Sequence, residues 1–383
     1  MPALSEYANR CPSPPSDYEN DDATEEDQLG NYSRTEIIRL FIGLQKYMTN
    51  DIAAVGEEDI CNVWDAVNSA PVADFLMQND VINVLLLIIE RCDNDVRLGE
   101  ICAGIIANLL TNVSDEHLKE FNDATETILY IFFHERDPLY LHQVVRYCHT
   151  CLLRTGQEES GGLIAPILRQ KEAFVPKLSF ILSNCTNHQL LRDVLNLIEL
   201  DGDASHGVIA ITDEFFDAIF CAFDTLLTSF DFSHMLDSEE NNATITVLRV
   251  LSDLVGTGRP ISSKNVEFLL TTALTQIHKD LMNNREELIV TDIANFFDLF
   301  LYLLGSAFVA KQTEFENGDC LIATLDFAQF FKSSPLDYSS TLVTINTLLK
   351  SQIKILTRFN QFETFVPDNS DIEKKLLDIL SIE

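Results

Sequence analysis

Residues 80–112 read DVINVLLLIIERCDNDVRLGEICAGIIANLLTN, and this stretch decides the fold of the chain. It contains two apolar segments with helical spacing, 81–90 and 98–109, separated by a polar turn. The first is apolar on almost every side, which is typical of a helix buried between neighbours. In the second, Ala103, Gly104 and Ala107 leave room for close contact between helices. Because such a pair cannot cover its own apolar surface, the stretch predicts a stack of similar pairs.

Helical patterns recur on both sides of this stretch. Ser33 is expected to cap the first helix, and Trp64, the only tryptophan, is expected to anchor the N-terminal end of the stack. Helix pairs repeat at roughly forty residues, which is the period of armadillo and HEAT repeats. We therefore predict an all-α, armadillo/HEAT-like right-handed α-solenoid over residues 32–383. Acidic segments at 201–203 and 237–240 are predicted to be loops between pairs.

The expected pairs after the opening stretch follow one another along the chain. They are 125–134 with 139–153, 174–182 with 189–199, 213–227 with 244–255, 266–282 with 288–304, and 321–331 with 339–359. Residues 1–31 are different, because they are rich in Pro, Ser, Asp and Glu and have little apolar surface to bury. They are predicted to form a disordered acidic tail.

The formal net charge of −34 limits the classes of partner. A phosphate backbone or an anionic membrane surface would be repelled, so nucleic acid and membranes are not expected partners. Partners recognised electrostatically are expected to be basic, and the alternative is that acidity only keeps an apolar-rich chain soluble. The nine cysteines, placed mostly on apolar helix faces, favour a reducing compartment, and no signal peptide is predicted. The apolar stretch 293–310 is interrupted by Asn295 and Asp298, which favours a buried helix over a membrane span.

In a solenoid of this type, the last helix of each repeat lines a concave groove, and its polar residues can hold an extended peptide. Aligning the paired aliphatic residues of these helices gives two ladders one turn apart. The candidate groove residues taken from them are Asn108, Tyr147, Arg192, Asn196, Arg249, Asp253 and Tyr302. Asparagine amides can pair with both backbone groups of a bound peptide. The alternative is that these polar residues hydrogen-bond between helices.

Histidines and cysteines gather between residues 134 and 151, but their spacing does not match a metal site. Cys148 and Cys151 have the C-x-x-C spacing on a predicted helix, whereas zinc pairs usually lie on a turn with a second pair nearby. They are interpreted as structural cysteines on an apolar helix face. Since the sequence also contains no nucleophile elbow, zincin or phosphate-loop motif, we expect no catalytic residues, no metal and no cofactor.

Three segments carry a family resemblance: EDICNVWD at 58–65, VADFL at 72–76 and LGEICAGIIAN at 98–108. In this order and spacing they resemble the serum amyloid A-like protein 1 family. The resemblance implies an armadillo-type, non-enzymatic protein of the nucleus or cytoplasm that is associated with promotion of cell proliferation. We therefore predict an intracellular protein-interaction scaffold that binds protein partners, including basic or extended peptides. The alternative is an adaptor or regulatory subunit in nuclear transport that recognises basic peptides.

Overall fold

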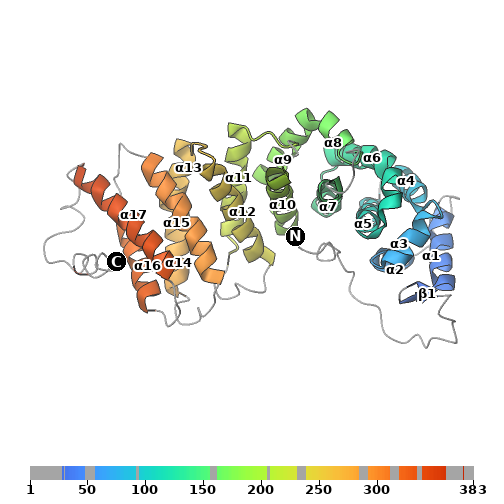
Figure 1. Cartoon of the computed structure of the whole chain (residues 1–383), viewed down its shortest axis with the longest axis horizontal. Helices are drawn as coiled ribbons and strands as arrows, with labels where there is room; N and C mark the ends of the chain where they lie inside the picture. The colour runs from blue at the N-terminus through green and yellow to red at the C-terminus, as the bar shows by residue number, and fades with distance from the viewer. Residues whose placement is uncertain are drawn as a thin grey trace. The chain divides into compact units, whose positions relative to one another are not determined.

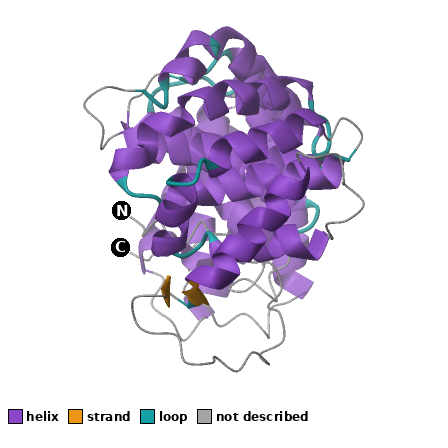
Figure 2. Ribbon diagram, turned by 90° about the vertical axis from the view of Figure 1, so that its right-hand side faces the viewer, coloured by secondary structure: helices purple, strands orange, loops and turns teal. Residues whose placement is uncertain are grey.

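The structure is a computed structural model, and it describes residues 28–29, 31–47, 57–91, 95–155, 162–204, 208–230, 239–283, 292–310, 319–333, 339–358 and 374. The described residues are almost entirely helical (Figure 2), so the prediction of an all-α chain is confirmed. The one sheet among them is a short antiparallel pair, β1 (Gln28–Leu29) with β2 (Tyr32–Ser33), in which Leu29 faces Tyr32. Apart from Gln28–Leu29 and Asn31, the predicted tail lies outside the described residues.

Contacts within the chain divide it into two compact units. Unit 1 comprises residues 1–178 and 196–210, and unit 2 comprises residues 179–195 and 211–383, so the division falls within two helices, α9 (Lys171–Asn184) and α10 (His188–Ala204). The other helices of unit 1 are α1 (Arg34–Tyr47), α2 (Glu57–Ala66), α3 (Ala70–Met77), α4 (Val81–Arg91), α5 (Val96–Asn112), the 3-10 helix η4 (Asp115–Glu120), α6 (Phe121–His134), α7 (Pro138–Thr155) and α8 (Ala165–Arg169). Those of unit 2 are α11 (Asp213–Leu227), α12 (Glu239–Gly256), α13 (Ser263–Phe268), the π-helix η6 (Leu269–Ala273), α14 (Leu274–Asn283), α15 (Asp292–Ala310), α16 (Asp319–Ser333) and α17 (Ser339–Arg358).

Helices stack in two layers within each unit. In unit 1, α2, α5 and α7 pack in one row, and α4, α6 and α8 pack in the other (Figure 1). In unit 2, α12, α15 and α17 form one row, while α14 packs on α16. Helices that follow each other along the chain, such as α4 and α5 or α16 and α17, join the two rows. Each row buries the apolar face of the other, as expected of helical hairpins that cover one another.

Short polar residues fix the starts of the helices. Ser33 caps α1, because its Oγ accepts the N–H of Glu36 at 3.2 Å while the Glu36 carboxylate accepts the N–H of Ser33 at 2.8 Å. This capping box confirms the predicted start of the first helix. Asp95, Asp137 and Thr212 cap α5, α7 and α11 by accepting the N–H of the residue three positions later, without a reciprocal side-chain bond.

The hydrogen bonds between neighbouring hairpins join residues at a nearly constant sequence separation. In unit 1 the bonds from Ser114 to Asp74, from Lys177 to Glu135 and from Arg169 to Glu126 span 40, 42 and 43 positions. In unit 2 the corresponding separations run from 41 to 48. Each hairpin of the described part is therefore held by the hairpins next to it in sequence.

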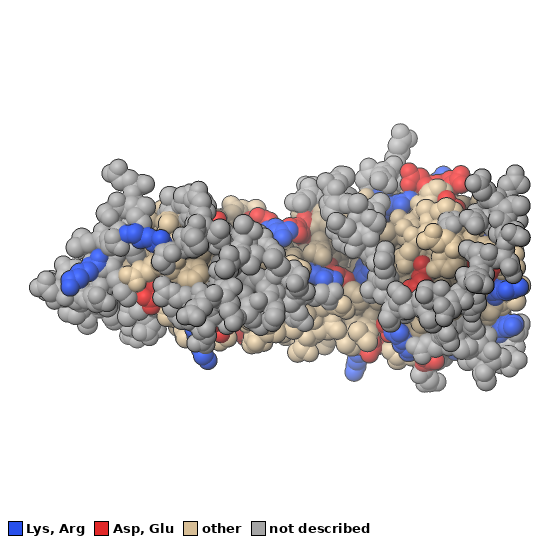
Figure 3. Space-filling view, turned by 90° about the horizontal axis from the view of Figure 1, so that it is seen from below, with Lys and Arg blue, Asp and Glu red and all other residues tan. Residues whose placement is uncertain are grey.

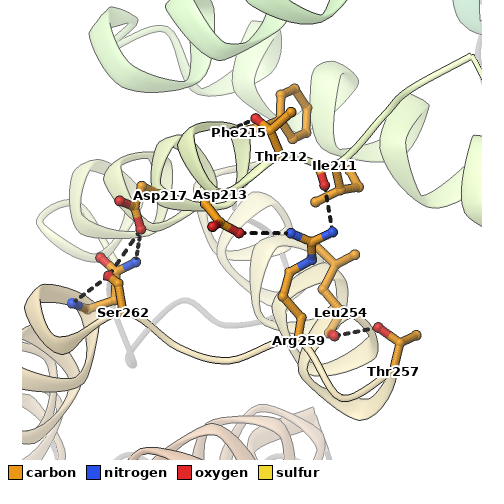
Figure 4. Close-up of polar contacts among 10 residues, drawn as sticks. Ile211, Thr212, Asp213, Phe215, Asp217, Leu254, Thr257, Arg259 and Ser262 are labelled. Carbon is orange, nitrogen blue, oxygen red and sulfur yellow. Dashed lines mark hydrogen bonds and ion pairs between the residues drawn. The ribbon is translucent and has the colours of Figure 1, made fainter.

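One such junction in unit 2 fastens the start of α11 to the segment between α12 and α13 (Figure 4). Arg259 donates to the carbonyl of Ile211 and, at 3.3 Å, to the carboxylate of Asp213. Asp217, one turn further along α11, accepts from Ser262 at 3.1 Å and from Asn265. The start of α11 is thus held by four hydrogen bonds from three residues of the next hairpin, Arg259, Ser262 and Asn265.

The predicted loop at 201–203 is wrong, because α10 continues through it to Ala204. Asp201 is buried, and its two carboxylate oxygens accept the N–H groups of Val208 and Ile209 at 3.0 and 2.9 Å. The acidic residue therefore serves the backbone that follows the helix instead of breaking the helix. Of the second predicted loop, Glu239 and Glu240 begin α12, and residues 237–238 lie outside the described part.

The apolar stretch at 293–310 forms most of α15, and its Phe296, Phe297 and Phe300 are fully buried. Among the described residues, no single helix is long and apolar enough to cross a membrane. The bent pair of α3 and α4, with 78° between them, satisfies the criterion by length and composition alone.

Candidate functional site

The predicted groove residues differ in accessibility. Asn108 and Tyr147 are fully buried, Arg192 and Asn196 are half-buried, and Arg249 and Asp253 are exposed. Tyr302 keeps 44% of its surface exposed. For Asn108 and Tyr147, the structure shows hydrogen bonds between helices, which was the alternative to peptide contact.

Asn108 joins α5 to α7 through Arg146. The Nη2 of Arg146 donates to the Oδ1 of Asn108 at 2.8 Å, and its Nη1 donates to Gln143 on the same helix. All three side chains are buried, and Arg146 retains 9% exposure. The Nδ2 group of Asn108, in contrast, has no hydrogen-bond partner. Because the amide oxygen is held by Arg146, the amide nitrogen faces in another direction.

The indole of Trp64, which belongs to α2, packs against α5 at Gly104. A Cβ at Gly104, one turn before Asn108, would lie 2.5 Å from Cζ2 of the Trp64 indole, so the ring rests directly on the helix backbone. The prediction that Gly104 permits a close helix contact is confirmed. Trp64 is 5% exposed, and its Nε1 group also has no hydrogen-bond partner. Buried donors of this kind usually find an acceptor, because an unmade hydrogen bond in the interior is costly.

Tyr147 lies in the interior between α7 and α6. Its hydroxyl shares a 2.7 Å hydrogen bond with Thr125 and donates to the carbonyl of Phe121 at 3.3 Å. Burial raises its pKa well above the ordinary value for tyrosine. The phenol therefore stays neutral and acts as a structural link.

A second arginine of α7 closes the end of α5. Arg154 donates to the carbonyls of Thr111 and Val113 at 3.2 and 2.8 Å, and to the carboxylate of Asp115 at 2.9 Å. A cation at this point compensates the unpaired carbonyls and the negative end of the helix dipole. Arg146 and Arg154 thus fasten α7 to the middle and the end of α5.

The cysteines of the C-x-x-C pair face the core of unit 1. Cys148 and Cys151 are both fully buried in α7, where burial raises the pKa of Cys148 to about 12 and that of Cys151 well above its usual value. Protonated thiols are poor nucleophiles and poor metal ligands. Within the part of the chain that the structure describes, no group of three or more His, Cys, Asp or Glu side chains is placed to hold a metal ion.

The charges of the described residues are mixed despite the acidity of the whole chain. On the face seen in Figure 3, Lys and Arg side chains lie close to Asp and Glu side chains. Two long helices, α7 with the sequence PLYLHQVVRYCHTCLLRT and α17, have no Asp or Glu. In α7 the buried side chains are the ones that concern this region. The ionisable basic side chains of α7 are His142, Arg146, His149 and Arg154.

Sequence reasoning did not select Arg146 or Arg154 for this region, and it predicted Trp64 only as an anchor of the N-terminal end of the stack. The absence of acidic residues from 138–155 in so acidic a chain is the signal that could have pointed to the arginines. No local signal could have paired Trp64 with Gly104, because the two residues come from separate helices.

Comparison with known proteins supports the resemblance drawn from the sequence motifs. The chain is 31% identical to Protein saal1 of Danio rerio over 212 residues, which is 50% of this chain and 43% of that protein. It is 28% identical to Protein saal1 of Xenopus tropicalis over 206 residues, covering 50% and 44%, and 27% identical to Protein SAAL1 of Homo sapiens over 150 residues, covering 37% and 29%. These relatives bear the name of the serum amyloid A-like protein 1 family, which the sequence motifs resemble, and the similarity extends over about half of this chain.

The aligned region spans less than half of the length of these curated relatives. No family model matches the chain.

Proposed function

We propose that this protein is a non-enzymatic protein-interaction scaffold built from armadillo- or HEAT-type helical repeats. The observation that carries the proposal is the narrow range of sequence separation between residues that hydrogen-bond from one hairpin to the next. In the described chain this separation is 38 to 48 positions. Armadillo and HEAT repeats have periods of about 40 to 47 residues. Two-layer stacking of the hairpins supports the same reading, since in a solenoid each repeat contacts its neighbours.

The row formed by α5 and α7 in unit 1, and the row formed by α12, α15 and α17 in unit 2, are the faces proposed to bind partners. In unit 2, Arg249 and Asp253 are exposed one turn apart on α12, and Tyr302 is exposed on α15. A cation, an anion and an aromatic hydroxyl on successive helices can bind both the backbone and the side chains of an extended segment. Action in the nucleus or cytoplasm and in growth control belongs to the proposal through the family resemblance.

Replacing residues of the proposed face tests the function. The variant R249A/D253A should lose partners that the unaltered chain captures in affinity purification, while its circular dichroism stays unchanged. The matched control is K264A/E267A, which also removes one exposed cation and one exposed anion, but from α13. Equal loss in both variants, or retention of all partners in R249A/D253A, would refute a binding role for the α12 face.

A further inference from the structure

The first helix that the structure describes, α1, exposes apolar side chains between cations. Ile38 and Ile42 lie one turn apart on one face of the helix and are 41% and 48% exposed. Arg34 continues the same line one turn earlier, and Arg39 flanks it three positions before Ile42; both arginines are exposed. We call Arg34, Ile38, Arg39 and Ile42 the α1 stripe. Terminal repeats of helical stacks need a polar outer face, and the α1 stripe does not provide one.

The α1 stripe belongs to a locally basic part of an acidic chain. Besides the two arginines, α1 has an exposed Lys46 near its end and a single carboxylate, that of Glu36. This carboxylate accepts the N–H and the hydroxyl group of Ser33 at 2.8 and 2.9 Å. The described charged side chains of the helices packed on α1 are Asp65 of α2 and Glu90 and Arg91 of α4. A segment that covers the stripe should therefore combine carboxylates with an apolar side chain.

The chain carries a segment of this chemistry next to α1. Residues 16–27 read SDYENDDATEED, with seven carboxylates, no Lys or Arg, and one aromatic residue, Tyr18. They lie outside the described residues, but the residue that follows them is described. Gln28 pairs with Ser33 in the β1–β2 hairpin, and Ser33 caps α1. Position 27 therefore adjoins the first turn of the helix.

The segment is long enough to reach the whole stripe. Ten positions separate Tyr18 from Gln28, and an extended chain of this length spans up to about 33 Å. The distance along α1 from Ser33 to Ile42 is about 14 Å. Because the segment is tethered, its effective concentration is on the order of millimolar, and weak contacts suffice. Two copies of α1 would instead bring cations against cations.

We propose that residues 16–27 bind the α1 stripe of their own chain, with the Tyr18 ring on Ile38 and Ile42 and carboxylates at Arg34 and Arg39. Arg34 is already positioned, because its guanidinium lies 5.5 Å from the centroid of the Phe75 ring. The bound segment supplies the polar cover that a terminal repeat requires. A tail without a fold of its own, as its composition predicts, is ordered at this contact alone. The inference goes beyond the proposed function and does not depend on the α12 face.

Carbodiimide crosslinking of the full chain tests the contact, because this reagent joins an amine only to a carboxylate that touches it. R39K keeps the charge of the stripe and places an amine at its centre. An equal mixture of nitrogen-15-labelled and unlabelled R39K chains is crosslinked, digested and mapped by mass spectrometry. We expect a link from position 39 to residues 17–27 in which both halves carry the same isotope. The link from position 39 to Glu36, one turn earlier, serves as the internal measure of amine reactivity.

Two variants in the R39K background separate the apolar contact from simple proximity. I38S/I42S keeps the amine and every carboxylate, and its link to residues 17–27 should fall about fivefold or more relative to the Glu36 link. V96S/L139S is the matched control, because it removes two apolar side chains that are each 44% exposed, from the starts of α5 and α7. Its link should form as in R39K alone. Unchanged circular dichroism shows that both variants are folded.

The proposal is overturned if the Glu36 link forms without the link to residues 17–27, or if I38S/I42S retains the yield of R39K. It is also overturned if the linked halves carry different isotopes, which would assign the stripe to a second copy of the chain. None of these results alters the capture of partners by R249A/D253A. Failure of the α1 contact and failure of the scaffold function are therefore distinguishable.

Discussion

The contact between Trp64 and Gly104 gives a sharp test of the structure, because adding one methyl group should disrupt it. In G104A the new Cβ would lie 2.5, 2.8 and 2.9 Å from three carbon atoms of the indole ring. Ordinary contact begins at 3.4 Å, so the ring or the helix must move by about 0.9 Å. The indole is buried, and a close-packed interior has no space to receive such a shift.

The expected magnitude follows from two opposing effects. Overpacking of this kind costs about 1–3 kcal/mol, while replacing glycine by alanine inside a helix contributes up to about 1 kcal/mol in the other direction. With the full alanine contribution, we therefore expect G104A to lower the free energy of unfolding by up to about 2 kcal/mol. G43A is the matched control, because a Cβ at Gly43 in α1 meets nothing within 4 Å. It should raise stability by about 0.5–1 kcal/mol.

Urea denaturation followed by the emission of Trp64 measures both variants in unit 1, where the probe and both glycines lie. G104A should shift the midpoint to lower urea and alter the native emission, and G43A should shift it to higher urea with native emission unchanged. If both variants are stabilised, Trp64 does not rest on α5.

Three further perturbations have defined outcomes. R154M should destabilise the chain by about 2–3 kcal/mol in thermal denaturation, because it leaves two carbonyls at the end of α5 without a donor. The control R169M removes an exposed arginine and should change stability by less than about 1 kcal/mol. Equal effects of the two variants would contradict the capping role of Arg154. D80G should raise stability by about 0.5–1 kcal/mol, because Asp80 has a φ of 63°, a left-handed conformation that glycine adopts without steric strain. A lower melting temperature of D80G would contradict this prediction. Burial keeps the pKa of the Cys148 thiol at about 12, above the ordinary value of 9.0. The contribution of this raised pKa to stability should be fully present below pH 9 and should decline as pH rises from 9 towards 12. In denaturation curves measured across this range, C148A should therefore lose less stability with rising pH than the unaltered chain. An equal loss of stability in both would contradict the burial of the thiol.

The elements that could be predicted from the sequence are those with local causes. Ser33 caps α1 because a capping box needs only four consecutive residues, and the helical class follows from the apolar spacing of each segment. The tolerance of Gly104 for a close neighbour was also predictable, but the identity of that neighbour was not. Trp64 lies forty positions earlier, and its contact depends on how α2 packs against α5.

Asn108 shows the limit of the argument for the site. Its spacing predicted a place on a polar ladder, yet the structure buries it against Arg146 of α7. Whether a polar residue on such a helix faces a partner or a neighbouring helix depends on the register of the two helices. That register is set by side chains in both helices, and no single segment contains it. The outcome at Asp201 has a different cause, because its carboxylate accepts backbone N–H groups that follow its own helix.

The stacking of hairpins also limits how far the net charge of −34 determines the potential beside any one helix. Neighbouring helices pack about 8–10 Å apart, and the Debye length at physiological salt is about 8 Å. Exposed charges more than one hairpin away are therefore largely screened at any point on a row. At α7, which has no acidic residue, Asp115 is paired with Arg154, and on α5 Glu100 is paired with Arg97. Net charge should govern the solubility of this chain and its long-range encounters, whereas the composition of each helix should govern what binds beside it.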